Sequence, residues 1–262
     1  MIEYVKETVR EAGEFLLDGY DGDSGIRNIA RSSNKLVTEY DLESERLIVS
    51  RLNSRWKGYN IVSEEEMSAQ KGSEFTWLID PLDGTSSFIK RSPFFSISVA
   101  LVRGREIVLG VVYAPALGEM YEAVKGGGAL LNGKSAGVSA TAALADSLIF
   151  FSRGSDRQGW RSTAVLDALV PRVAEWKKLG SAALEACWVA CGEGDGCVLN
   201  AINPWDIAAG ALMVEEAGGG VTDFYGKPWK GGKEFLVLSN GLLQPELVNL
   251  TKNALGPGSK RF

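Results

Sequence analysis

Apolar residues recur every three or four positions at the start of the chain, as on one face of an amphipathic helix. They are Ile2, Val5, Val9, Ala12 and Leu16. Residues 21–25 are polar and contain glycine, so they should end this helix. Residues 31–41 are polar without a clear period, and we expect a loop or a short hairpin there before a second helix at 42–55.

Short apolar runs bounded by turn residues follow, and they are typical of strands. In the first half of the chain we predict strands at residues 59–63, 76–80, 95–102, 107–113, 119–124 and 129–131. In the second half we predict strands at 147–152, 175–179, 196–201, 220–224 and 235–239, and helices at 162–174, 181–191, 204–217 and 243–254. This alternation predicts helices layered on sheets, in the α/β class.

Residues 134–146 are small and polar and mark the best boundary between two halves. Because this segment is too short for a free linker, we expect residues 1–140 and 141–262 to form one compact unit. A chain of 262 residues, 45% of them hydrophobic, is long enough to bury a large core.

The most informative motif runs from Asp80 to Thr85 and reads Asp-Pro-Leu-Asp-Gly-Thr. It follows a predicted strand and so lies where open α/β sheets place ligands. The carboxylates of Asp80 and Asp83 can converge on a hard cation such as Mg²⁺. Gly84 lets the backbone approach a ligand, and free N–H groups of a helix starting here would face a phosphate. The other interpretation is an Asp-rich surface turn.

Composition narrows the chemistry. The chain has no histidine, which excludes Ser-His-Asp and Cys-His machinery and histidine-ligated metals. Acid–base work must therefore come from carboxylates, hydroxyls, lysines or water on a metal. Because three cysteines are an odd count, we expect Cys187, Cys191 and Cys197 to be small buried thiols and not a disulfide framework.

Charge and hydropathy exclude further classes. The net charge is −5 and there is no basic block, which disfavours a nucleic-acid partner. The N-terminus lacks a signal pattern, and no stretch approaches the roughly 18 apolar residues of a membrane span. We expect a cytoplasmic protein without a membrane partner.

Two more motifs accompany the central one. Glu64 and Glu65 follow the predicted strand at 59–63, and residues 204–210, Pro-Trp-Asp-Ile-Ala-Ala-Gly, open a predicted helix. With Asp80–Thr85 they resemble, in order, the Glu-Glu, Asp-Pro-(Ile/Leu)-Asp-Gly-Thr and Trp-Asp-x-Ala-Ala-Gly motifs of the inositol monophosphatase superfamily of metal-dependent phosphatases. The resemblance implies an α-β-α-β-α sandwich with metal-binding motifs in the first half and a second half that completes the site.

The resemblance implies ligands for two or three Mg²⁺ ions, namely Glu64, Asp80, the Leu82 carbonyl, Asp83 and Asp206. It implies catalytic roles for Glu64, through the activating ion, and for Thr85 and Asp41, beside the attacking water. From the residues alone, Glu64 could belong to a solvated acidic run, Asp206 could cap a helix, and Thr85 could cap backbone.

Substrate contacts implied by the resemblance are Asp83, Gly84, Thr85, Ser152, Arg153, Gly180, Ser181, Ala182 and Asp206. A plain helix cap explains Ser181 as well, and Asp195 either supports the pocket or is a turn residue. Lys35 stands where many relatives carry an acid, and it is either solvated or close to phosphate. Counting back from Asp206, Leu199 stands where animal inositol phosphatases carry a glutamate that holds inositol hydroxyls; alternatively, a gap shifts this neighbourhood and Asn200 or Asn203 substitutes. We expect an open substrate rim without strict inositol specificity.

We therefore predict a Mg²⁺-dependent phosphomonoester hydrolase that acts on sugar phosphates through metal-activated water, as a homodimer. The expected substrates are inositol 1-phosphate, fructose 1,6-bisphosphate or both, as in compact microbial relatives. One alternative is a 3′-phosphoadenosine 5′-phosphate phosphatase, which the short step from Glu64 to Asp80 disfavours. The other is a non-catalytic regulator that binds metal or phosphate on the same fold.

Overall fold

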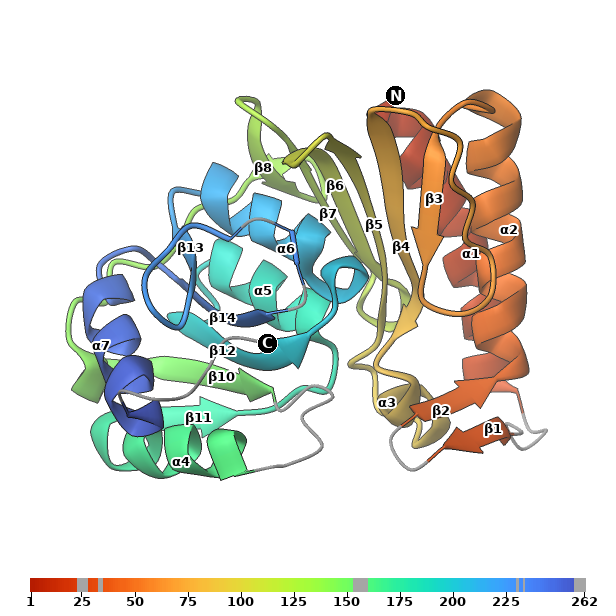
Figure 1. Ribbon diagram of the computed structural model, residues 1–262. Coiled ribbons are helices and arrows are strands. Elements are labelled where there is room, and N and C mark those ends of the chain that lie inside the picture. Colours follow the sequence, from red (N-terminus) through yellow and green to blue (C-terminus); the bar gives the residue numbers. More distant parts are fainter. Residues whose placement is uncertain (23–27, 33–34, 153–159, 230, 233, 257–262) are drawn as a thin grey trace.

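The computed structural model of the protein describes residues 1–262 apart from 23–27, 33–34, 153–159, 230, 233 and 257–262. Figure 1 shows two twisted sheets, a pair of helices between them, and a pair of helices on the outer face of each. The order of layers is helices, sheet, helices, sheet, helices. The predicted α-β-α-β-α sandwich is confirmed.

Two long helices, α1 (Ile2–Asp21) and α2 (Glu39–Arg55), form the first layer. The apolar stripe of α1 is buried as predicted. Between the helices, β1 (Asn28–Ser32) and β2 (Lys35–Thr38) pair antiparallel, so the hairpin alternative is confirmed. Helix α2 begins three residues earlier than predicted, because Thr38 accepts hydrogen bonds from the first-turn backbone and caps it.

The first sheet has seven strands in the order β3-β4-β5-β6-β7-β8-β9. They are β3 (Asn60–Ser63), β4 (Phe75–Asp83), β5 (Ser96–Arg103), β6 (Glu106–Ala114), β7 (Glu119–Val124), β8 (Gly128–Leu131) and β9 (Lys134–Ser135). Strands β3 and β4 are parallel, and the other pairs are antiparallel. Side chains alternate along β4, so that Trp77 and Ile79 pack against α1 and α2, whereas Leu78 faces the inner helices.

The second sheet has five strands in the order β11-β10-β12-β14-β13. They are β10 (Leu148–Ser152), β11 (Glu175–Lys177), β12 (Gly196–Ile202), β13 (Gly220–Asp223) and β14 (Glu234–Ser239). Helices α5 (Ala182–Ala190) and α6 (Pro204–Glu216) lie between the sheets, and α4 (Trp160–Leu169) and α7 (Gln244–Leu255) cover the outer face. In the described part of the chain, no helix has the length and apolar character needed to span a membrane.

Two predicted boundaries were wrong for local reasons. The helix predicted at 162–174 ends at Leu169, because Pro171 cannot continue it and residues 170–172 form a 3₁₀ turn. The strand predicted at 76–80 continues to Asp83, because a register shift between Asp80 and Asp83 accommodates Pro81 without ending the strand.

Small residues let α6 lie close to its neighbours. A Cβ atom at Gly110 on β6 would lie 2.9 Å from the Cα atom of Ala209, and one at Gly210 would lie 2.7 Å from the Cβ atom of Ala186 on α5. Only glycine permits these approaches without a shift of backbone. The Ala-Ala-Gly part of the third motif thus sets the depth of α6, and with it the position of Asp206 in the first turn.

Candidate active site

Three carboxylates from separate segments meet at one end of the first sheet. Glu64 follows β3, Asp80 lies on β4, and Asp206 lies in the first turn of α6; one oxygen atom from each lies within 4.8 Å of the others. Parallel pairing of β3 with β4 places the first two side by side. The Ser98 hydroxyl on β5 donates to the Trp205 carbonyl at 3.1 Å and holds the start of α6 against the sheet.

Burial and mutual repulsion dominate the electrostatics of this cluster. Burial raises the pKa of Asp80 well above its usual range, and the carboxylates of Glu64, Asp83 and Asp206 raise it further. Burial likewise raises the pKa of Asp206, followed by the charges of Glu64 and Asp83. Carboxylates this close disfavour each other's charge unless a cation is present. An oxygen-only donor set of this kind fits a hard divalent cation.

Asp206 also caps α6. Its Oδ2 atom accepts hydrogen bonds from the backbone N–H of Asn203 at 3.1 Å and from Asn203 Nδ2 at 3.2 Å. These bonds lower its pKa and oppose the effect of burial. The carboxylate is thus anchored on one oxygen, and capping and cation binding are compatible in this geometry.

Asp83 has different surroundings, although it lies three residues after Asp80 on the same strand. Its Oδ2 atom accepts hydrogen bonds from Ser181 Oγ at 2.7 Å and from the backbone N–H of Ala183 at 2.8 Å. Burial raises the pKa of Asp83 to about 6, and these bonds act in the opposite direction. This contact joins the end of β4 to the N-terminus of α5 and so links the two halves of the chain.

Ser181 has several contacts in addition to its predicted role with substrate. Its hydroxyl is fully buried, lies 2.9 Å from Ser96 Oγ, and accepts a hydrogen bond from the Leu184 N–H at 3.1 Å. It therefore caps α5 while it donates to Asp83. Ala182 is 4% exposed, and Gly180 adopts a φ of +104°.

Thr85 and Asp41 form the pair that the resemblance implied. Thr85 begins the short helix α3 (Thr85–Ile89), and its Oγ1 atom donates to Asp41 Oδ1 at 3.0 Å, with the Leu82 carbonyl at 3.1 Å. The other oxygen of Asp41 accepts bonds from the N–H and hydroxyl of Thr38. Burial raises the pKa of Asp41, and these hydrogen bonds oppose that shift.

Gly84 joins β4 to α3 in a conformation that other residues avoid. Its φ is +91°, and a Cβ atom there would lie 2.8 Å from the Phe94 carbonyl oxygen. Both features require glycine. The chain therefore turns sharply at Gly84, so that strand β4 ends at Asp83 and helix α3 begins at Thr85.

Helix α2 contributes two residues that the sequence analysis missed. Its buried positions form one stripe, made of Asp41, Ser44, Glu45, Ile48, Val49 and Leu52. The Ser44 hydroxyl donates to the Pro81 carbonyl at 2.9 Å, and the Glu45 carboxylate accepts backbone N–H groups from residues 65–67. The available signal was spacing, because Ser44 and Glu45 continue the apolar stripe of Ile48 and Leu52.

Glu185 on α5 was also missed. Its side chain is fully buried, and Oε1 accepts backbone N–H groups from Leu179 at 2.8 Å and Gly180 at 3.3 Å. Burial raises the pKa of Glu185 to about 7, although these bonds lower it. It holds the segment that leads into Ser181.

The remaining predicted residues lie in different surroundings. Ser152 ends β10, is 8% exposed, and pairs in register with Leu199 on β12. Leu199 is fully buried in the apolar core between the sheets, so the expectation that it lines an open rim was wrong. Side chains alternate between the two faces of a strand, and the Leu199 side chain lies on the face of β12 that packs against helices α5 and α6. Arg153 lies outside the described residues, as does the side chain of Lys35.

Asp195 lies at the start of β12, at the opposite end of this strand from Asp206. One carboxylate oxygen accepts a hydrogen bond from Ser139 Oγ at 2.6 Å, and the other accepts one from the backbone N–H of Leu148 at 2.7 Å. These contacts hold the connection between the sheets, which agrees with the turn interpretation. The three cysteines carry free thiols, with Cys187 and Cys197 fully buried and Cys191 partly buried.

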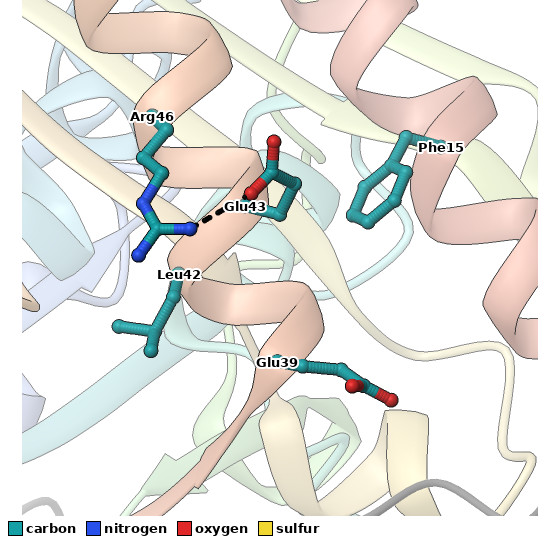
Figure 2. A pocket seen from close by; sticks show the side chains of 5 residues that line it. All are labelled: Phe15, Glu39, Leu42, Glu43 and Arg46. Atoms are coloured by element: carbon teal, nitrogen blue, oxygen red, sulfur yellow. Dashed lines mark hydrogen bonds and ion pairs between the residues drawn. The ribbon is translucent and has the colours of Figure 1, made fainter.

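A surface hollow of about 330 Å³ lies elsewhere, between α1 and α2. Figure 2 shows its lining: Phe15, Glu39, Leu42, Glu43 and Arg46. Arg46 pairs with Glu43 at 3.0 Å, and both side chains are more than half exposed. The hollow contains none of the carboxylates described above, so we place the chemistry at the buried cluster.

Comparison with known proteins agrees with this assignment. A profile of the inositol monophosphatase family matches residues 1–255. The fructose-1,6-bisphosphatase/inositol-1-monophosphatase of Thermotoga maritima is 36% identical over 260 residues, covering 97% of this chain and 96% of that protein. The Nus factor SuhB of Pasteurella multocida is 37% identical over 262 residues, covering 98% of this chain and 96% of that protein.

A solved structure shows the same similarity in three dimensions. The IMPase of Thermotoga maritima is 36% identical, covers 97% of both chains, and gives a TM-score of 0.88. The family profile spans both sheets and all three motifs. The chain belongs to the inositol monophosphatase family, a family of phosphoric monoester hydrolases.

Proposed function

We propose that the protein is a Mg²⁺-dependent phosphatase of sugar phosphates, including inositol 1-phosphate and fructose 1,6-bisphosphate. The observation that carries the proposal is the buried cluster of Glu64, Asp80 and Asp206, whose oxygen atoms lie within 4.8 Å of one another. Glu64, Asp80, Asp83, Asp206 and the Leu82 carbonyl would hold two or three ions. When bound, Mg²⁺ neutralises phosphoryl oxygens and makes a water molecule easier to ionise.

The chain's own groups prepare the nucleophile. Because Thr85 Oγ1 donates a hydrogen bond to Asp41 at 3.0 Å, its lone pairs are oriented to accept a hydrogen bond from a water molecule. This acceptance orients the water and raises its nucleophilicity, in the manner of general-base catalysis. Burial raises the pKa of Asp41, which makes its carboxylate a better proton acceptor toward Thr85.

Substrate recognition would combine a common phosphoryl site with a variable rim. We assign Gly84, Thr85 and the segment Gly180–Ala182 to the phosphoryl group and nearby oxygens, and Ser152 and Arg153 to the rim. The two residues that we assign to this rim carry no carboxylate to hold inositol hydroxyls. A site without that polar partner imposes little penalty on a substrate that lacks the matching hydroxyl. The relative from Thermotoga maritima carries both activities in its name, which supports a broad range.

The test is phosphate release from inositol 1-phosphate, fructose 1,6-bisphosphate and adenosine 3′,5′-bisphosphate, each with Mg²⁺ and with EDTA. We expect release from the first two substrates with kcat/KM values within about 10³-fold of each other, and loss of release in EDTA. Release in EDTA would contradict the cation assignment. A preference for the adenosine compound, or no release from any substrate, would favour one of the two alternatives. The homodimer and the cytoplasmic location stay predictions, the first of which light scattering can check.

A further inference from the structure

We propose that Glu45 is a positioning residue for the cation site, because it holds the loop that carries Glu64. This inference rests on the proposed function of the acidic cluster. The Glu45 carboxylate accepts hydrogen bonds from backbone N–H groups beside Glu64. It would act through the backbone of residues 65–67, which directly follow Glu64.

The contacts of Glu45 are numerous and buried. The residue is 1% exposed. Its Oε1 atom accepts the N–H groups of Glu65 and Glu66, each at 3.2 Å, and its Oε2 atom accepts those of Glu66 at 3.0 Å and Met67 at 3.2 Å. Three successive backbone amides therefore converge on one carboxylate. This is an anion-binding arrangement of the backbone, occupied by a side chain of the protein itself.

The loop is fixed to the sheet at both ends. Before it, the Glu64 N–H donates to the Ile79 carbonyl at 3.1 Å. After it, Ala69 and Ile61 exchange two backbone hydrogen bonds, at 2.8 and 2.9 Å. Glu45 holds the middle of the loop. Without this contact, the backbone beside Glu64 would be free to rotate its side chain away from Asp80 and Asp206.

Helix α2 serves as a common reference for three parts of the site. Asp41 contacts Thr85, Ser44 contacts the Pro81 carbonyl, and Glu45 contacts the loop after Glu64. The three residues stand at positions i, i+3 and i+4 and thus share one face of the helix. A rigid helix therefore fixes the distances among segments that are far apart in the sequence.

The chemistry requires a carboxylate, even though the loop is acidic. Glu64, Glu65 and Glu66 add negative charge near Glu45, and a neutral side chain would avoid this repulsion. However, a carboxylate has only acceptors, whereas the amide of glutamine points a donor at one set of N–H groups. Glutamate suits this buried position because backbone N–H groups of the loop point at both of its carboxylate oxygens.

The test compares Glu45→Gln with a matched control, Glu216→Gln. Glu216 also holds a turn by two backbone amides, from Gly126 at 2.9 Å and Gly128 at 3.0 Å. It lies ten residues after Asp206 on α6, roughly 15 Å away along the helix axis. Cation binding is measured by calorimetry with Mg²⁺ on EDTA-treated protein, and the Mg²⁺ concentration for half-maximal phosphate release is measured in parallel.

We expect Glu45→Gln to weaken Mg²⁺ binding by about 10-fold to 100-fold, as for residues that support metal ligands. Saturating Mg²⁺ should restore kcat to within about threefold of wild type, which a misfolded site would not allow. Glu216→Gln should keep the wild-type affinity for Mg²⁺. Glu45→Asp keeps the charge but shortens the side chain by about one bond length, roughly 1.5 Å. Its affinity for Mg²⁺ should lie between those of Glu45→Gln and Glu216→Gln.

The outcomes separate this inference from the proposed function. If wild-type protein binds no Mg²⁺, the proposed function fails. If the wild type binds and either folded Glu45 variant binds with wild-type affinity, the positioning role is wrong. If Glu45→Gln does not fold, Glu45→Asp decides the question by the same measurement.

Discussion

The surroundings of Asp80 and Asp83, three residues apart on β4, are opposite in kind. Burial raises the pKa of Asp80, and the carboxylates of Glu64, Asp83 and Asp206 raise it further. Asp83 is buried against the N-terminus of α5, where Ser181 and Ala183 donate hydrogen bonds to it. The protein thus combines a cluster of like charges with a carboxylate that neutral donors already satisfy.

This difference separates two tasks within one motif. Repulsion makes the Asp80 cluster a favourable place for a divalent cation and an unfavourable one in its absence. The hydrogen bonds of Asp83 need no cation and tie the first sheet to the second half of the chain. We infer that cation removal strains the cluster and leaves the Asp83 junction intact.

The sharpest test of the comparison uses the same substitution at both positions. Asp80→Asn and Asp83→Asn should each lower kcat by roughly 10³-fold or more, because each removes several kcal/mol of stabilisation of phosphoryl charge. Their effects on stability in EDTA should differ in size. Asp80→Asn relieves burial of a charge and repulsion by its neighbours and should raise Tm, whereas Asp83→Asn offsets the relief of a buried charge by weakening two charge-assisted bonds and should change Tm less.

Thermal unfolding in EDTA and phosphate release with Mg²⁺ check this prediction on the same samples. Asp80→Asn keeps an oxygen atom for the Leu82 N–H, which donates to Asp80 at 3.0 Å, so its effect reports on charge. An active Asp83→Asn protein would remove Asp83 from the cation ligands. Equal changes of Tm in the two variants would contradict the division of tasks.

The second prediction concerns Thr85, which follows Asp83 by two residues and donates to Asp41. Thr85→Ala should slow turnover by roughly 10²-fold or more, since positioning of a water by general-base-type contacts contributes about 10²–10⁴-fold. Thr85→Ser keeps the hydroxyl and should keep most of the rate. If Thr85 only capped backbone, Thr85→Ala would instead lower stability by about 1 kcal/mol and leave kcat nearly unchanged. Steady-state kinetics and unfolding together distinguish these results.

The motif around Asp80 could be predicted from the sequence because its function is local. Two acids, a glycine with positive φ and a hydroxyl stand within six residues. Acids bind cations, glycine permits a sharp turn, and a hydroxyl can hydrogen-bond a water molecule. The layered fold followed from the alternation of strands and helices. These are properties that neighbours along the chain determine.

Residues that act across the fold could not be predicted in this way. Glu45 is a buried glutamate whose backbone partners stand 20 to 22 residues further along the chain, and a pattern of polar residues alone suggests a solvated face. The wrong placement of Leu199 has the same cause, because burial of a strand position depends on what packs over the sheet. Only the assembled layers place α5 and α6 against β12.

The third prediction is a dependence of stability on pH that changes with the cation. In the folded protein the pKa of Asp83 rises from 3.8 to about 6, and that of Glu185 from 4.5 to about 7. The folded state therefore binds protons more tightly than the unfolded state. This contribution is fully present below the unfolded values and is lost as pH rises through the folded values.

In EDTA we thus expect the free energy of unfolding to fall between about pH 4 and about pH 7. With Mg²⁺ the fall should be smaller or reversed, since cation binding needs deprotonated carboxylates. Denaturant titrations at several pH values measure both curves. Parallel curves would mean that Mg²⁺ does not bind the carboxylates of this site.

The smallest predicted effect concerns the backbone that leads to Asp206. Ala201 has a φ of +51° and lies in a register irregularity of β12 between Leu199 and Ile202. The left-handed conformation destabilises a folded protein with alanine at this position by roughly 1–2 kcal/mol. Glycine removes this strain, but it raises the conformational entropy of the unfolded chain and so lowers stability by about 0.4–1 kcal/mol. Ala201→Gly should therefore stabilise the protein by roughly 0.5–1 kcal/mol.

The matched control for this change is Ala164→Gly in helix α4, where glycine should instead destabilise by about 1 kcal/mol. Opposite signs in denaturant titrations would show that the irregularity of β12 stores strain beside the acidic cluster. The kcat of Ala201→Gly should stay within about twofold, because the change leaves the capping bonds of Asp206 in place. A loss of Mg²⁺ affinity in Ala201→Gly would instead mean that a stiff alanine backbone is needed to direct Asp206 toward Glu64 and Asp80.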